Sequence, residues 1–204
     1  PMFIAMDRPK HDEQRKVVSP VTGAENLRHF EPIIRERTID VLDQLPVGKT
    51  FDWVEHVSVE LTTRMLATLF DFPFEERHKL TRWSDVATAI PGMGIIDTEE
   101  QRHQELLGCL EYFTELWNER INTPPKNDLI SMLTHGEATR NMAPMEYLGN
   151  LVLLIVGGND TTRSTMTASA LALHQNALQF EKLVAHPELI DSMVAETIRW
   201  QTPL

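Results

Sequence analysis

Hydrophobic positions recur at helical spacing along most of this chain. Apolar residues follow one another three or four positions apart, and stretches rich in proline, glycine or polar residues separate these runs. Such spacing predicts helices, and no segment shows the strict alternation of a half-buried strand. The chain is therefore expected to be mainly α, with little or no β structure. Helices are predicted at about residues 7–18, 22–45, 52–70, 75–90, 98–121, 128–133, 144–174, 176–185 and 188–200.

The predicted helix at about 144–174 is the longest and the most apolar. Pro144 suits a first helical turn, and Glu146 lies near the positive end of the helix dipole. At 1.5 Å per residue this helix extends about 45 Å. A helix that is apolar nearly all round belongs in a core. Its middle nevertheless carries Gly157 and Gly158, each about 1 kcal/mol less favourable in a helix than alanine.

Polar residues follow these glycines at once, in the run Gly157-Gly158-Asn159-Asp160-Thr161-Thr162. Positions four apart share a helix face, so Leu153, Gly157 and Thr161 align. The Thr161 hydroxyl can bond the carbonyl of Gly157 one turn back. Two interpretations remain open. Either a flat ligand approaches the backbone at the glycines beside the acid Asp160, or a second helix packs closely there.

Composition narrows the classes of function. The 204 residues can build one core, and the formal net charge of −11 argues against a nucleic-acid binder. A single cysteine excludes a disulfide framework and fits a reducing cytoplasm. We expect a cytoplasmic protein without a membrane anchor, because the unbroken apolar runs are far shorter than the ~20 residues of a membrane span.

Three further features carry candidate chemistry. His11 and Arg15 lie four apart and could hold an anion together, although such pairs are also common on solvated helix faces. Glu196 and Arg199 have the spacing of a helical ion pair. The segment 91–97, Pro-Gly-Met-Gly-Ile-Ile-Asp, is an unusually apolar loop. It is either a gate over an apolar pocket or a loop held against the core.

Together these motifs resemble cytochrome P450 monooxygenases. The run 157–162 is similar to the oxygen-binding groove in the long distal helix of that family, and Glu196-Thr197-Ile198-Arg199 matches its Glu-x-x-Arg motif. Asp7-Arg8-Pro9 followed by His11-x-x-x-Arg15 resembles the segment that holds the haem propionates in bacterial members. The resemblance covers the whole chain and implies the helical central portion of the cytochrome P450 fold.

The sequence around these motifs resembles that of a narrower group, the bacterial alkane hydroxylases of the superfamily. The resemblance rests on residues 3–7, 62–73 and 80–85. Members of that group oxidise the terminal carbon of medium-chain alkanes and fatty acids. It implies an apolar small-molecule substrate, dioxygen, haem, and a ferredoxin with its ferredoxin reductase as electron donors.

The family resemblance also implies a role for each motif residue. His11 and Arg15 would bind the haem propionates, and Glu196 with Arg199 would form a structural ion pair. Gly157 and Gly158 would open the oxygen groove, Asp160 and Thr161 would be catalytic, and Leu153 and Val156 would face the substrate.

One departure from the family is large. The haem iron needs a cysteine thiolate, which the family supplies in a Phe-x-x-Gly-x-x-x-Cys-x-Gly loop that this sequence lacks. Cys109 lies in a predicted helix without flanking glycines and is not assigned as the ligand, so no metal ligand is predicted. We therefore expect residues 1–204 to form a single partial domain, lacking the N-terminal region and the Cys-ligand loop, and inactive by itself.

Two alternatives from other classes remain. A carboxylate-bridged di-iron protein would use Glu75-x-x-His78 and Glu100-x-x-His103, which have the required spacing. A non-catalytic helical ligand-binding domain would use an apolar pocket and would leave the polar run after Gly158 without a function.

Overall fold

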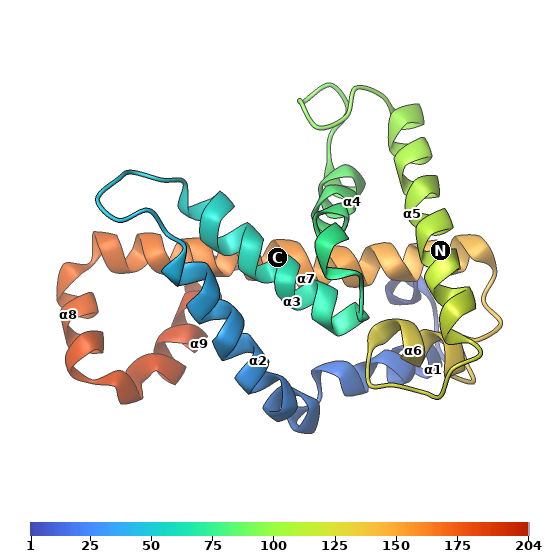
Figure 1. Ribbon diagram of the computed structural model, residues 1–204, viewed down its shortest axis with the longest axis horizontal. Coiled ribbons are helices and arrows are strands. Elements are labelled where there is room, and N and C mark those ends of the chain that lie inside the picture. The colour runs from blue at the N-terminus through green and yellow to red at the C-terminus, as the bar shows by residue number, and fades with distance from the viewer. Residues whose placement is uncertain (204) are drawn as a thin grey trace.

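The long helix α7 (Pro144–Gln175) crosses the whole molecule, and the other helices are arranged around it (Figure 1). The computed structural model describes residues 1–203, and no strand occurs within them. The predicted mainly α fold and the predicted long helix at about 144–174 are both confirmed. Pro144 occupies the start of α7, where a missing N–H costs no helical bond.

The elements that precede α7 follow the predicted helices closely. They are α1 (Lys10–Val18), α2 (Ala24–Asp43), α3 (Glu60–Phe70), α4 (His78–Thr88), α5 (Glu99–Arg120) and α6 (Leu129–His135). After α7 come α8 (Ala177–Ala185) and α9 (Ile190–Gln201). Short 3-10 turns lie at Phe3–Ala5, Ser19–Thr22, Phe74–Glu76 and Pro187–Leu189.

Side-chain caps explain several helix starts. The Thr98 hydroxyl accepts a bond from the N–H of Gln101, and Asp128 accepts one from the N–H of Ser131. Each cap satisfies a backbone donor that the first helical turn leaves without a partner. The helix predicted at 52–70 differs in one respect, because its first part forms a π-helical turn at Val54–Val59 before α3 begins.

The main core lies where α3, α4, α5 and the first half of α7 meet. Phe70 and Phe113 are completely buried, with ring centroids 5.5 Å apart in an edge-to-face arrangement. Four residues of α7 are buried in the same cluster: Tyr147, Leu148, Leu151 and Ile155. This half of α7 is therefore fixed by packing, which matters for the polar run that follows it.

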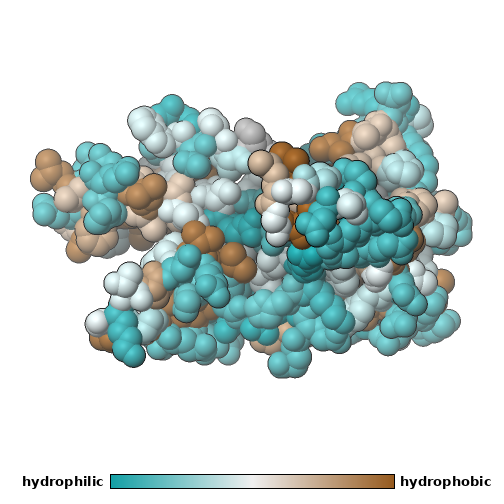
Figure 2. Space-filling view, turned by 90° about the horizontal axis from the view of Figure 1, so that it is seen from above, coloured by the Kyte–Doolittle hydropathy of each residue, from teal (hydrophilic) through white to brown (hydrophobic). Residues whose placement is uncertain are grey.

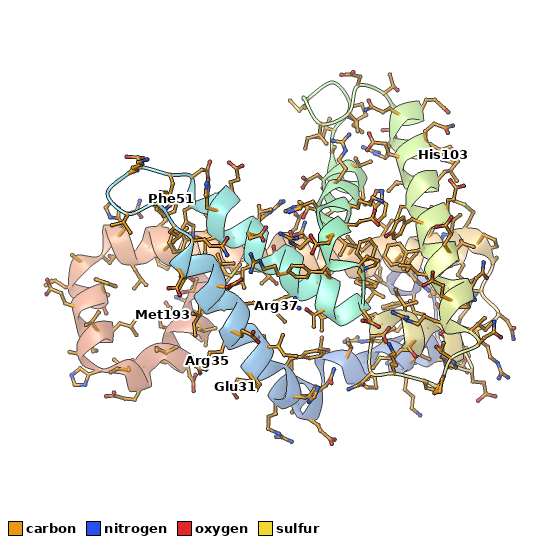
Figure 3. The ribbon with its side chains drawn as sticks, in the orientation of Figure 1. Glu31, Arg35, Arg37, Phe51, His103 and Met193 are labelled. Carbon is orange, nitrogen blue, oxygen red and sulfur yellow. The ribbon has the colours of Figure 1, made fainter. Side chains whose placement is uncertain are left out.

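The far end of α7 is packed very differently. Neither α8 nor α9 has a buried residue. Figure 2 shows hydrophobic residues interspersed with hydrophilic ones on this end of the molecule. The large hydrophobic residues exposed on α8 and α9 include Leu178, Val184, Val194 and Trp200. A hollow of about 520 Å³ lies between the end of α7, α8 and α9, lined in part by Leu173 and Met193 (Figure 3).

The apolar loop at 91–97 is partly held against the core and partly exposed, so it has a feature of each of the two interpretations that the sequence left open. Gly92 and Gly94 have φ values of +78° and +96°, which favour glycine. Ile96 is buried in a small cluster with Val86 and Ala89, whereas Met93 is 74% exposed. The loop is thus attached to the core at one point and presents apolar side chains to the surface at another.

Candidate functional site

The open side of α7 is centred on Gly157. This residue is exposed, and a Cβ added to it would have no neighbouring heavy atom within 4 Å. The Thr161 hydroxyl, one turn further on, donates a hydrogen bond to the Gly157 carbonyl at 3.3 Å, as the spacing predicts. Half-buried Leu153 and Val156 lie on the N-terminal side of the same region. A ligand can therefore approach the α7 backbone here.

Gly158 has the opposite surroundings. A Cβ added to it would lie 2.7 Å from Cδ1 of Leu66 on α3, which is closer than real Cβ contacts. Gly158 therefore allows two helices to approach closely, and it does not open toward solvent. The two interpretations that the sequence left open thus apply to different glycines: close packing at Gly158 and an accessible backbone at Gly157.

Asp160 belongs to an ion-pair network that the sequence analysis missed. Its Oδ1 accepts a hydrogen bond of 2.5 Å from Nη2 of Arg163, on the next turn of α7. Arg163 also lies 3.3 Å from Oδ1 of Asp85 on α4. The i, i+3 spacing of Asp160 and Arg163 was visible in the sequence. The contact with Asp85 was not, because it depends on how α4 crosses α7.

His11 and Arg15 share one face of α1, as predicted. Nδ1 of His11 lies 2.8 Å from the carbonyl oxygen of Phe3, so the ring donates there from Nδ1, and its Nε2 lies 3.9 Å from Oδ1 of Asp12. Arg15 is exposed. The two side chains remain accessible to an anion.

Polar contacts, from an exposed ion pair to a buried amide pair, attach α1 to the start of α7. Lys10 Nζ lies 2.8 Å from a carboxylate oxygen of Glu146, and Gln14 Nε2 donates to the same carboxylate at 2.5 Å. Asn150 Nδ2 donates to Gln14 Oε1 at 3.0 Å. The hydrogen bond from Lys10 lowers the pKa of Glu146 and outweighs the opposing effect of burial. This network fixes His11 and Arg15 relative to the polar run on α7.

Glu196 and Arg199 form a bidentate ion pair on α9. Arg199 Nε and Nη2 donate to the two carboxylate oxygens at 2.7 and 2.6 Å, a geometry typical of strong pairs. The hydrogen bond from Arg199 lowers the pKa of Glu196. Both side chains are more than half exposed, so the pair joins two turns of one helix and contributes little to stability.

Cys109 is completely buried in the core cluster of α5, and burial raises the pKa of its thiol. It is therefore a packed, protonated side chain and not a thiolate that could bind iron. The burial of Cys109 is therefore consistent with the expectation that this residue is not the iron ligand.

The geometry does not support the di-iron alternative. Glu75, His78, Glu100 and His103 are all exposed, and His103 lies on the outer side of α5 (Figure 3). Within residues 1–203, no group of three or more His, Cys, Asp or Glu side chains could hold a metal ion. In the same residues, no helix has the combination of length and hydrophobicity needed to cross a membrane.

Known proteins with a similar structure decide the family. No protein-family model matches the chain. CYP153D17 from Sphingomonas sp. PAMC 26605 aligns with the entire chain at 53% identity and a TM-score of 0.89. Cytochrome P450-153 from Novosphingobium aromaticivorans does so at 47% identity and a TM-score of 0.87. The chain belongs to the cytochrome P450 family.

Curated cytochrome P450 relatives are more distant. Linalool 8-monooxygenase from Pseudomonas putida is 28% identical over 203 residues, which is 99% of this chain and 50% of that protein. The two solved structures are likewise covered to 51% and 49% of their length. The chain therefore spans about half the length of the relatives it matches, and corresponds to the central part of the cytochrome P450 fold.

The residues present fit the side of a haem that binds dioxygen. The α7 backbone is open at Gly157, where a Cβ would meet nothing. A cationic and a potentially cationic side chain, Arg15 and His11, are accessible on α1. The iron ligand is a different matter, because buried Cys109 cannot supply it. The geometry thus fits the cofactor on the α7 side, whereas Cys109, the single cysteine of the chain, does not supply a thiolate ligand.

Proposed function

We propose that the complete gene product is a haem-dependent monooxygenase that hydroxylates an apolar substrate at a terminal carbon. The observation that carries this proposal is the exposed backbone at Gly157, which follows the packed first half of α7 and lies beside Thr161 and Asp160. When bound, haem supplies the iron centre at which dioxygen is activated with two electrons. The proposal requires a thiolate from a cysteine other than Cys109, which is buried in the core.

His11 and Arg15 hold the haem propionates in this proposal. Charge-assisted bonds from Arg and protonated His to carboxylates are stronger than neutral ones. The Lys10–Glu146 pair and the Gln14–Asn150 bond keep α1 in place for this purpose.

Thr161 and Asp160 control protons at the open side of α7. The Thr161 hydroxyl donates to the Gly157 carbonyl over a long 3.3 Å bond, so it can turn toward a bound oxygen at little cost. Arg163 binds one carboxylate oxygen of Asp160. The other oxygen remains available to pass a proton from solvent toward the Thr161 hydroxyl. Gly157 contributes by having no side chain that would fill this space.

The substrate is proposed to be a medium-chain alkane or fatty acid. Leu153 and Val156 offer apolar, half-buried surface beside the open backbone. The segments at residues 3–7, 62–73 and 80–85 that resemble alkane hydroxylases support this choice, as does the identity of about half with two P450-153 structures. A ferredoxin and its reductase are the proposed electron donors, in the cytoplasm.

The proposal is tested with the complete gene product, purified and supplied with a ferredoxin, its reductase and NADH. Products from n-octane, octanoic acid and linalool are compared. We expect 1-octanol or the ω-hydroxy acid as the main product. Oxidation of linalool alone would disprove the substrate class, and a purified protein that binds no haem would disprove the reaction.

A further inference from the structure

On the side of α7 opposite Gly157, a group of polar side chains joins α7 to the helical segment 54–70, and we call this group the polar seam. The seam consists of Asn159 and Thr167 on α7, Ser58 in the π-helical turn and Thr62 on α3. Thr62 Oγ1 lies 3.2 Å from Asn159 Oδ1, and Thr167 Oγ1 lies 2.9 Å from Ser58 Oγ. Each threonine hydroxyl has one hydrogen and also lies within hydrogen-bond distance of a nearby backbone carbonyl, that of Ser58 for Thr62 and that of Arg163 for Thr167. Asn159 and Ser58 are completely buried. Two contacts, two turns apart on α7, thus connect α7 to the π-helical turn and to α3, which follow each other directly in the chain.

The side chain of Asn159 is unfavourable for the stability of the fold. Its Nδ2 is buried and has no hydrogen-bond partner among residues 1–203. A buried donor without a partner is destabilising, and an apolar side chain of similar size would avoid this cost. Stability alone therefore does not explain an asparagine here, whereas a requirement for one fixed orientation of α7 does.

Helix geometry connects this orientation with the open side. Successive residues are about 100° apart around an α-helix. Gly157 and Thr161 each lie two positions from Asn159, so they point about 200° away from it. When Asn159 is held against α3, Gly157 and Thr161 must face the opposite side. Gly158, held close to Leu66 of α3, enforces the same rotation.

We propose that Asn159 is a positioning residue, which Thr62 holds so that α7 presents Gly157 and Thr161 to the haem. The inference rests on the proposed function, because it assigns the anchor for the same site. The Ser58–Thr167 bond is the second attachment, which keeps the far half of α7 from turning independently.

Thr62 and Thr63 provide a matched pair of variants. Both are almost fully buried, and both hydroxyls lie within hydrogen-bond distance of a backbone carbonyl one turn back, that of Ser58 for Thr62 and that of Val59 for Thr63. Thr62 also bonds Asn159 on α7, whereas Thr63 bonds Thr81 on α4 at 2.6 Å. Thr62→Val and Thr63→Val therefore make the same chemical change at the same depth, and only the first removes the contact with α7.

The experiment uses the haem-loaded complete gene product and two readouts. The first is the C–O stretching frequency of the ferrous protein with carbon monoxide, which reports the polarity beside the iron. The second is the fraction of electrons that appear in product. Thr161→Ala serves as the positive control for both.

We expect Thr62→Val to shift or broaden the C–O band and to lower the product fraction by about 2- to 10-fold, the change in an equilibrium that one buried hydrogen bond makes. Thr62→Ser keeps the donor and should restore both readouts. Thr63→Val should leave both unchanged while lowering the melting temperature. Asn159→Leu, which removes the donor that has no partner, should fold well and reproduce the spectral change of Thr62→Val.

Three results would overturn the inference. If Thr62→Val and Asn159→Leu match wild type in both readouts while Thr161→Ala does not, the seam is only structural and the proposed function stands. If Thr161→Ala leaves the C–O band unchanged, the groove assignment fails and the inference fails with it. If the complete protein forms no complex with haem and carbon monoxide, the proposed function itself is wrong.

Discussion

The two sides of α7 are built in opposite ways from adjacent residues. On the side that faces α3, Gly158 lies against Leu66 and Asn159 is buried on Thr62. On the other side, Gly157 is exposed and the hydroxyl of Thr161 donates to the preceding turn of its own helix. A helical glycine is unfavourable by about 1 kcal/mol at either position. At Gly158 close packing offsets that cost, whereas at Gly157 no contact does, and this difference is why the proposal places the oxygen groove at Gly157.

The largest expected effect is on the open side. Replacing Thr161 with alanine removes the hydroxyl beside Gly157 together with one methyl group of a partly buried side chain. In the complete gene product, we expect electron consumption to continue while product falls severalfold, because proton delivery to the bound oxygen is disturbed. The ratio of product to NADH consumed measures this. An unchanged ratio would show that Thr161 has no role in the reaction.

The two glycines give the sharpest contrast. Gly157→Ala has room for its methyl group and should raise the free energy of unfolding by up to about 1 kcal/mol, while lowering the product ratio because it fills the groove. Gly158→Ala must displace Leu66, so the gain in helix propensity is lost and stability should not rise. Urea denaturation and product analysis of both variants check this. Equal behaviour would contradict the division between the two sides.

Arg163 tests whether the acid on α7 needs a partner. Arg163→Gln should slow product formation without changing the substrate KM, because Asp160 loses its contact with the guanidinium. Its effect on stability should stay below about 1 kcal/mol, since both groups are partly exposed. The control is Arg35→Gln, which breaks the exposed Glu31–Arg35 pair of α2 (Figure 3). If both variants have the same turnover, Arg163 has no part in proton delivery.

The smallest effect concerns the attachment of α1 to α7. The pKa of Glu146 is lowered by its hydrogen bond from Lys10. Its contribution to stability is therefore complete above the ordinary glutamate pKa of about 4.3 and is lost as the pH falls through the lowered value. Glu146→Gln should be less stable than wild type at pH 7, and the two should converge toward pH 3. Chemical denaturation at a series of pH values measures this, and a difference independent of pH would refute it.

Local patterns in the sequence were sufficient to predict the helices and part of the candidate site. The Thr161–Gly157 bond joins neighbours within one turn, so spacing alone predicts it. The Asp85–Arg163 contact and the Thr62–Asn159 bond were missed because they join residues 78 and 97 positions apart. Their formation depends on the crossing of α3 and α4 with α7, which periodicity does not encode.

The division of the glycines was missed for the same reason. Both have the same sequence context, and only the position of Leu66 on α3 distinguishes them. The family resemblance, by contrast, was available from the order and spacing of the motifs, and the P450-153 structures confirm it.

The most direct test of the account is a crystal structure of the complete gene product with its haem. We expect the haem to lie against the Gly157 and Thr161 side of α7, with its propionates at His11 and Arg15 and with Gly158 still in contact with Leu66. A haem bound elsewhere, for example in the hollow between α8 and α9, or a Gly157 covered by another part of the protein, would contradict it.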